Sequence, residues 1–162
     1  IPRYASYRST GKRRSLGDAA GSDKRFSFRI ENPESKDLHV FESAIDLLSY
    51  ATLVKKAGGE WKKENLMSLA GVYSGKADRT VKVPAALART LSENPKISRI
   101  FLHLDNDIAG RRAAKGLAES LCGRAEVYDE PPASGKDMND HLCMICGNEQ
   151  AMKKERTDRY ER

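Results

Sequence analysis

Residues 100–107 read Ile-Phe-Leu-His-Leu-Asp-Asn-Asp, a short apolar run that ends in two acidic residues. The run has the length of a buried strand, and a helix-length segment, 108–121, follows it directly. His103, inside the run, is expected to be buried and hydrogen-bonded. The carboxyl ends of parallel strands meet at one edge of a sheet, where ligands bind. The stretch therefore predicts a strand that delivers Asp105 and Asp107 to such an edge.

The same alternation of short apolar runs and amphipathic segments extends from residue 37 to residue 145. It is typical of βαβ units. It predicts an α/β fold with a mostly parallel central sheet of about four strands flanked by helices. Strands are expected at 38–41, 66–70, 100–104 and 125–128. Helices are expected from Ser43 to Gly58, from Pro84 to Asn94, over 108–121 and over 138–145.

The N-terminal segment has a different character. Residues 1–24 are rich in Arg, Ser and Gly and show no periodic pattern, which indicates a loop or arm. Residues 25–31 alternate, with Phe26, Phe28 and Ile30 on one face, which predicts an extra half-buried strand. We expect a basic arm with an extra strand over 1–36, an α/β domain over 37–147 and a charged tail over 148–162.

The formal net charge is +6, and residues 1–30 carry all of this excess, with eight basic and two acidic side chains. Clustered positive charge favours a polyanionic partner, although a solvated arm without a specific partner fits equally well. No apolar run is long enough to span a bilayer, and the chain begins at Ile1 without a leader segment. We expect a piece of a longer cytoplasmic protein, with neighbouring domains as partners and with its three cysteines reduced.

Acidic residues follow three of the expected strands. Glu42 ends the first, Asp105 and Asp107 end the third, and Asp137 and Asp140 follow the fourth. Carboxylates gathered at one edge repel one another, and a divalent cation relieves this repulsion. Mg²⁺ prefers hard oxygen ligands, so the pattern predicts an Mg²⁺ site, with Mn²⁺ as an alternative. Asp-x-Asp alone is weak evidence, because it more often marks only a solvated turn.

Three motifs together are more specific. Glu42 is followed four residues later by Asp46, Asp105-Asn106-Asp107 continues into Ile108-Ala109-Gly110-Arg111-Arg112, and Gly135-Lys136-Asp137 lies near the end. In this order, over residues 37–146, they resemble the Toprim family, and specifically the branch of DnaG-type primases and related plasmid or mobile-element proteins. One departure is Ser43, where the primase motif usually has Gly after its Glu.

The resemblance implies a Toprim (Rossmann-like) fold and a role for each acid. Glu42 would act as general base or acid or help ligate the metal, while Asp105 and Asp107 would bind Mg²⁺. Asp46 and Asp137 would be further metal ligands, although a helix cap or surface ion pair explains each equally well. The basic residues that would contact nucleic-acid phosphates, or remain ordinary surface cations, are Arg13, Arg14, Lys24, Arg111 and Lys136.

The expected activity is Mg²⁺-dependent nucleotidyl transfer or other phosphodiester chemistry on DNA, in a primase-like domain of a larger replication or mobilisation protein. The partners are DNA, expected to be single-stranded, and nucleotides if the enzyme is a primase. A nuclease and a non-catalytic nucleic-acid docking module remain the alternatives. A topoisomerase would need a nucleophilic Tyr from another part of the protein.

Overall fold

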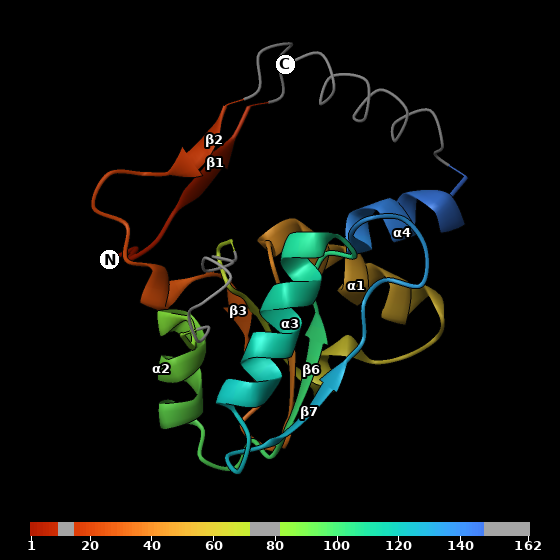
Figure 1. Ribbon diagram of the computed structural model, residues 1–162. Coiled ribbons are helices and arrows are strands. Elements are labelled where there is room, and N and C mark those ends of the chain that lie inside the picture. Colours follow the sequence, from red (N-terminus) through yellow and green to blue (C-terminus); the bar gives the residue numbers. More distant parts are fainter. Residues whose placement is uncertain (10–14, 72–81, 148–162) are drawn as a thin grey trace.

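A five-stranded sheet forms the centre of the described part of the chain, residues 1–9, 15–71 and 82–147 of the computed structural model (Figure 1). Its strand order is β3-β5-β4-β6-β7, with β4 to β7 parallel and β3 antiparallel to β5. This arrangement confirms the predicted α/β class and the mostly parallel sheet. The strands are β3 (Arg29–Ile30), β4 (Asp37–Phe41), β5 (Asn65–Ser68), β6 (Arg99–His103) and β7 (Glu126–Asp129).

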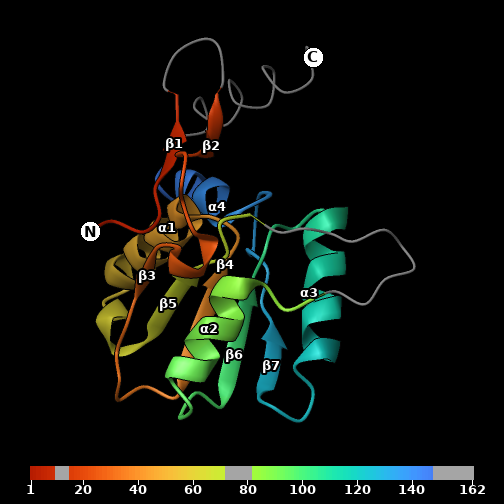
Figure 2. The same cartoon turned by 90° about the vertical axis from the view of Figure 1, so that its left-hand side faces the viewer.

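Helices cover both faces of the sheet (Figures 1 and 2). On one face α2 (Ala85–Glu93) and α3 (Ile108–Ser120) pack on the strands in the larger hydrophobic cluster. On the other, α1 (Ala44–Lys56) and α4 (Met138–Ile145) enclose a smaller cluster around Phe41 and Leu66. Because β4 is buried on both faces, it reads as an apolar run rather than an alternating pattern.

The expected helices are all present, and side-chain caps begin three of them. The side chains of Ser43, Asp107 and Asp137 accept hydrogen bonds from backbone N–H groups in the first turns of α1, α3 and α4. Two large apolar residues of α1 do not lie on its buried face, however. Ile45 and Leu48 are 38% and 50% exposed.

The N-terminal segment differs from the sequence prediction in two ways. Residues expected to be loop form a hairpin of β1 (Ser6–Arg8) and β2 (Leu16–Asp18), which stands away from the rest of the chain in Figures 1 and 2. The strand predicted over 25–31 shrinks to β3, because a 3₁₀ turn, η1 (Lys24–Phe26), comes first. Asp23 caps this turn by accepting from the Arg25 N–H at 3.0 Å.

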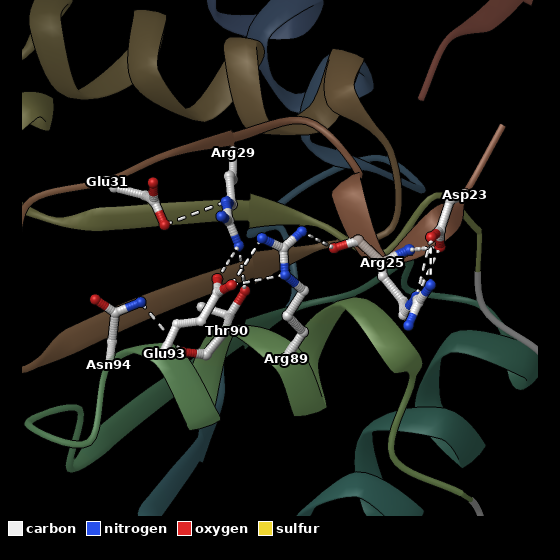
Figure 3. Close-up of polar contacts among 8 residues, drawn as sticks. All are labelled: Asp23, Arg25, Arg29, Glu31, Arg89, Thr90, Glu93 and Asn94. Atoms are coloured by element: carbon white, nitrogen blue, oxygen red, sulfur yellow. Dashed lines mark hydrogen bonds and ion pairs between the residues drawn. The ribbon is translucent and has the colours of Figure 1, made fainter. Parts of the chain in front are cut away.

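A network of arginines fastens the N-terminal segment to α2 (Figure 3). Arg29 Nη1 donates to Glu93 Oε2 at 3.1 Å, and Arg89 Nε donates to Glu93 Oε1 at 2.8 Å. The guanidinium groups of Arg3 and Arg89 lie over the Phe26 ring, 4.1 Å and 3.7 Å from its centroid. Phe26 therefore contacts two cations in a turn instead of continuing the expected strand.

His103 is buried and hydrogen-bonded, as the sequence predicted. Its Nε2 lies 2.8 Å from His39 Nδ1, and its Nδ1 lies 2.9 Å from the Glu130 carbonyl oxygen. Burial lowers the pKa of His39 to about 4 and that of His103 to about 3. Both imidazoles are therefore neutral at physiological pH.

Three further expectations concern the cysteines, membrane-spanning segments and the C-terminal tail. Cys122, Cys143 and Cys146 form no disulfide within the described part of the chain. Within the described ranges no helix combines the length and the apolar character that crossing a bilayer requires. The charged tail expected over 148–162 lies outside the described residues.

Candidate active site

Glu42 and Asp105 stand at the carboxyl ends of neighbouring strands. Glu42 directly follows β4, and Asp105 lies two residues beyond the end of β6, which pairs with β4 in parallel register. The chain passes from β4 to β5 on one side and later returns to β6 on the other. In open parallel sheets ligands bind at this kind of topological switch point.

A cleft of about 1150 Å³ opens at this point. The carboxyl edge of the sheet forms its floor, and the β1–β2 hairpin forms part of its wall. The functional side chains along the floor are Glu42, Asp46, Asp105, Lys136, Asp137 and Asn139. The sequence-predicted acids are thus largely gathered into one cleft. Asp107 is not among the lining residues and lies beside Lys136, outside the cleft.

Lys136 joins the two acids of the Asp-x-Asp motif. Its Nζ lies 2.5 Å from Asp105 Oδ2 and 3.1 Å from Asp107 Oδ2. Burial opposes the charged form of Lys136, but its hydrogen bond to Asp105 and the charges of both acids raise its pKa above the ordinary value. Burial opposes the charged form of Asp107, but the hydrogen bond from the Gly110 N–H and then the Lys136 ammonium lower the pKa of Asp107. Lys136 is therefore the internal counter-ion of this pair.

The loop that carries Lys136 is anchored at several points. The Asn106 N–H donates to the Lys136 carbonyl oxygen at 2.7 Å, which ties the loop to the end of β6. The Lys136 N–H donates to Asp140 Oδ2 at 3.0 Å. Gly135 adopts φ +78°, and a Cβ there would lie 2.5 Å from the Asp140 Cβ. Asp140, expected at the ligand edge, instead supports the loop.

Glu42 has the environment of a proton acceptor that titrates near neutrality. Burial and, next, the negative charge of Asp105 raise the pKa of Glu42 to about 7, with Lys136 opposing the shift. An acid or base is most effective when its pKa lies near the working pH. Glu42 is thereby able to exchange a proton at physiological pH.

Asp46 and Asp137 lie at the first turns of two helices that pack together. Burial raises the pKa of Asp46 to about 6, although the Ser43 hydroxyl, 2.5 Å from Asp46 Oδ2, lowers it. Asp137 accepts from the Asp140 N–H at 2.7 Å, and burial raises its pKa. The Asn139 N–H is 3.4 Å from Asp46 Oδ1 and links α4 to α1. Each acid thus holds local structure in addition to facing the cleft.

The glycine and first arginine of the motif position the end of β6. A Cβ on Gly110 would collide with the Asp105 carbonyl oxygen, so only glycine lets α3 approach the strand end so closely. Arg111 donates to the Leu104 carbonyl oxygen at 2.7 Å and to Asp129 Oδ1 at 2.5 Å. These two residues fix the backbone that presents Asp105.

The basic residues expected to contact phosphates have internal partners where they are described. Lys24 Nζ lies 3.0 Å from the Ala70 carbonyl oxygen and 3.3 Å from Asp18 Oδ2. Arg111 is bonded to the strand ends, and Lys136 to the Asp-x-Asp pair. Arg13 and Arg14 lie outside the described residues. Phosphate binding by these five side chains remains a prediction.

The acids fit Mg²⁺ in chemical type. All are carboxylates, the oxygen donors that this ion prefers, and their mutual repulsion contributes to the raised pKa of Glu42. Over residues 1–9, 15–71 and 82–147, however, no three acidic, histidine or cysteine side chains stand together as a set that could hold a metal ion. The Lys136 ammonium already contacts Asp105 and Asp107, so a cation held by both acids would displace it.

Some cleft residues were not among the site residues predicted from the sequence. The wall includes Tyr4, which precedes the hairpin, and Tyr7 and Arg8 of β1, and the floor includes Asn139. Strands of three residues are too short to show an alternating pattern, so the sequence did not predict the hairpin. The Gly-Lys-Asp motif did mark Lys136, but not its ion pair with the Asp-x-Asp acids.

Comparison with known proteins places this geometry in a family. Residues 39–142 match the family model described as Toprim-like. The chain belongs to the Toprim-like family. The matched region lies inside the predicted domain 37–147 and holds all five acids proposed from the sequence as catalytic or metal-binding. The Toprim resemblance is thereby confirmed, whereas the plasmid or mobile-element branch remains a prediction.

The fold of this Toprim-like chain is similar to that of a solved primase structure. The primase fragment of the bacteriophage T7 primase-helicase protein aligns with a TM-score of 0.50 and 19% sequence identity. The alignment covers 87% of this chain and 55% of the T7 fragment, so the chain spans about half the length of that structure. No curated protein sequence matches.

Proposed function

We propose that this chain is a primase-like catalytic domain that joins nucleotides on single-stranded DNA with the help of Mg²⁺ or Mn²⁺. The observation that carries the proposal is the meeting of Glu42 and Asp105 in one cleft at the switch point, with the pKa of Glu42 raised to about 7. The fold shared with the T7 primase fragment supports the same activity.

Glu42 is the general base in this proposal. It accepts the proton of a 3′-hydroxyl while that oxygen bonds to the α-phosphorus of a nucleoside triphosphate and pyrophosphate leaves. Asp105 and Asp107 would hold the metal ion, which supplies charge neutralisation on the phosphates. Lys136, released from both acids, lies at the cleft and would then contact a phosphate. Asp46 and Asp137 are proposed as additional ligands.

The parent protein and the DNA-contacting side chains are part of the same proposal. We place the domain in a larger cytoplasmic replication or mobilisation protein of a plasmid or mobile element, with further domains as partners. The basic side chains proposed to guide the DNA phosphates are Arg13, Arg14, Lys24, Arg111 and Lys136.

The proposal is tested with a single-stranded template, labelled ribonucleotides and Mg²⁺ or Mn²⁺. We expect short labelled products that disappear in Glu42→Gln and Asp105→Asn, while the exposed-site control Glu60→Gln retains them. Template cleavage without synthesis would instead assign a nuclease, in which water replaces the 3′-hydroxyl. Binding of DNA with neither activity, and with no Mn²⁺ bound, would assign a docking module.

A further inference from the structure

The β1–β2 hairpin faces the carboxylates across the cleft. Ser6, Tyr7 and Arg8 of β1 and Leu16 and Gly17 of β2 line the same space as Glu42 and Asp105. One wall of the cleft is therefore aromatic and basic, and its floor is acidic. No residue of this hairpin belongs to the motifs that identify the family.

The base of the hairpin is fixed to the rest of the molecule. The Tyr4 hydroxyl donates to Asp18 Oδ1 at 2.7 Å. Lys24 connects Asp18, at the end of β2, to the Ala70 carbonyl oxygen beyond the end of β5. The arginine network of Figure 3 then holds the following residues on α2. The wall consequently has a defined place relative to the carboxyl edge.

Tyr7 is the side chain of this wall that is suited to contact a base. It pairs with Gly17, and a Cβ at Gly17 would lie 2.8 Å from the Tyr7 hydroxyl oxygen and 3.1 Å from its Cζ. The ring thus lies across the glycine, which leaves room for it. The residue is still 54% exposed. A supported but exposed aromatic ring offers a flat apolar surface within the cleft.

We propose that Tyr7 is a stacking platform for single-stranded nucleic acid, with a base against its ring and the backbone crossing the carboxyl edge. Stacking on an aromatic ring tolerates any base, as a template-reading enzyme requires. The cleft exceeds the roughly 300–1,000 Å³ of small-molecule sites, which fits a polymer segment. Duplex bases are already stacked and cannot reach the ring. This inference rests on the proposed function, since it takes nucleic acid as the ligand.

The test measures binding of a fluorescein-labelled oligothymidylate to the full chain by anisotropy. Tyr7→Ala is expected to weaken binding on the order of tenfold, with an unchanged salt dependence because no phosphate contact is lost. Tyr7→Phe keeps the ring and should bind as wild type. Tyr128→Ala, an exposed tyrosine on β7 that does not line the cleft, is the matched control and should also bind as wild type.

A second measurement does not depend on affinity. Irradiation of the wild-type complex with an oligonucleotide containing 5-iodouracil should crosslink Tyr7, as mapped by mass spectrometry. Equal binding by Tyr7→Ala and wild type, a crosslink that maps away from the hairpin, or equal affinity for duplex would overturn the platform while leaving the catalytic proposal intact. A wild-type chain that binds no single strand, with or without Mn²⁺, would overturn both.

Discussion

Lys136 occupies the position where a bound cation would be expected. Its ammonium contacts both acids of the Asp-x-Asp motif, and it is carried by a loop that is itself anchored to the end of β6. Asp105 is only 8% exposed, so without a counter-ion its charge would be costly to bury. Lys136 thereby holds the two carboxylates close together before any metal binds.

This arrangement predicts competition between Lys136 and a divalent cation. Lys136→Met should bind Mn²⁺ several-fold more tightly than wild type, because the ion no longer has to displace an ammonium from Asp105 and Asp107. Titration followed by the electron paramagnetic resonance of free Mn²⁺ measures this directly, with the exposed Lys55→Met as control. Weaker binding by Lys136→Met would mean that the lysine assists the metal site.

Glu42 is predicted to lower the stability of the fold at alkaline pH. Its folded-state pKa of about 7 lies above the ordinary 4.5, so its charged form disfavours folding above neutrality. In EDTA at pH 8, Glu42→Gln should raise the free energy of unfolding by about 1–2 kcal/mol, allowing for partial solvation of the side chain. The gain should disappear by pH 4, where the carboxyl is protonated in both states. Urea denaturation at the two pH values measures the difference, and an equal effect at both would contradict it.

At the scale of elements, the site is built from strand-to-helix junctions that begin with capping side chains. Ser43, Asp107 and Asp137 each cap the helix that starts beside the cleft. Asp107 and Asp137 therefore combine a structural role with the proposed metal role. The two roles respond differently to substitution, because asparagine caps a helix as well as aspartate but is a neutral, weaker metal ligand.

For Asp137 this difference becomes a prediction. Asp137→Ala should cost about 1 kcal/mol of stability through loss of the α4 cap, whereas Asp137→Asn should remain within about 0.5 kcal/mol of wild type. If Asp137 is also a metal ligand, both variants should weaken Mn²⁺ binding. Thermal unfolding in EDTA and a parallel Mn²⁺ titration separate the two effects. Equal destabilisation by both variants would show that the cap is not what Asp137 contributes.

The sequence predicted those elements whose signals are local. Apolar runs, capping residues and the Gly58 and Asn94 breaks located the four parallel strands and the four helices. The strand predicted over 25–31 was mostly wrong. Its apolar and polar residues do alternate, but the apolar side chain of Phe26 packs outside the sheet. Phe26 packs against Arg3 and Arg89, which are distant in the sequence, and Asp23 caps a 3₁₀ turn. Such long-range contacts leave no periodic trace.

The site shows the same division. Strand ends and motif order brought Glu42 and Asp105 to one cleft, because parallel topology fixes where strand ends meet. The spacing of residues in the sequence predicted neither the ion pair of Lys136 with the Asp-x-Asp acids nor the cleft wall that contains Tyr7. Both depend on where a loop and a hairpin lie relative to the carboxyl edge of the sheet, which tertiary contacts determine.

At the scale of the whole molecule, two groups of buried side chains respond oppositely to acid. His39 and His103 have pKa values of about 4 and 3 in the folded state, below the ordinary 6.5. As pH falls below 6.5 the unfolded chain binds their protons first, and each lowers the free energy of unfolding. Glu42 and Asp46, at about 7 and 6, bind protons in the folded state first, and each raises it.

These opposing slopes predict how the acid response changes on substitution. Each group contributes about 1.4 kcal/mol per pH unit, so the two histidines and the two acids nearly cancel between pH 6 and 5. The net contribution of these four groups to wild-type stability in EDTA should therefore be nearly constant between pH 6 and 5. Glu42→Gln combined with Asp46→Asn removes the opposing acids, and its stability should fall by up to about 2.7 kcal/mol per pH unit. Urea titrations at closely spaced pH values measure both slopes. A double variant as flat as wild type would mean that the histidine pair protonates within the folded sheet, and the cleft acids would then have no part in protecting the fold from acid.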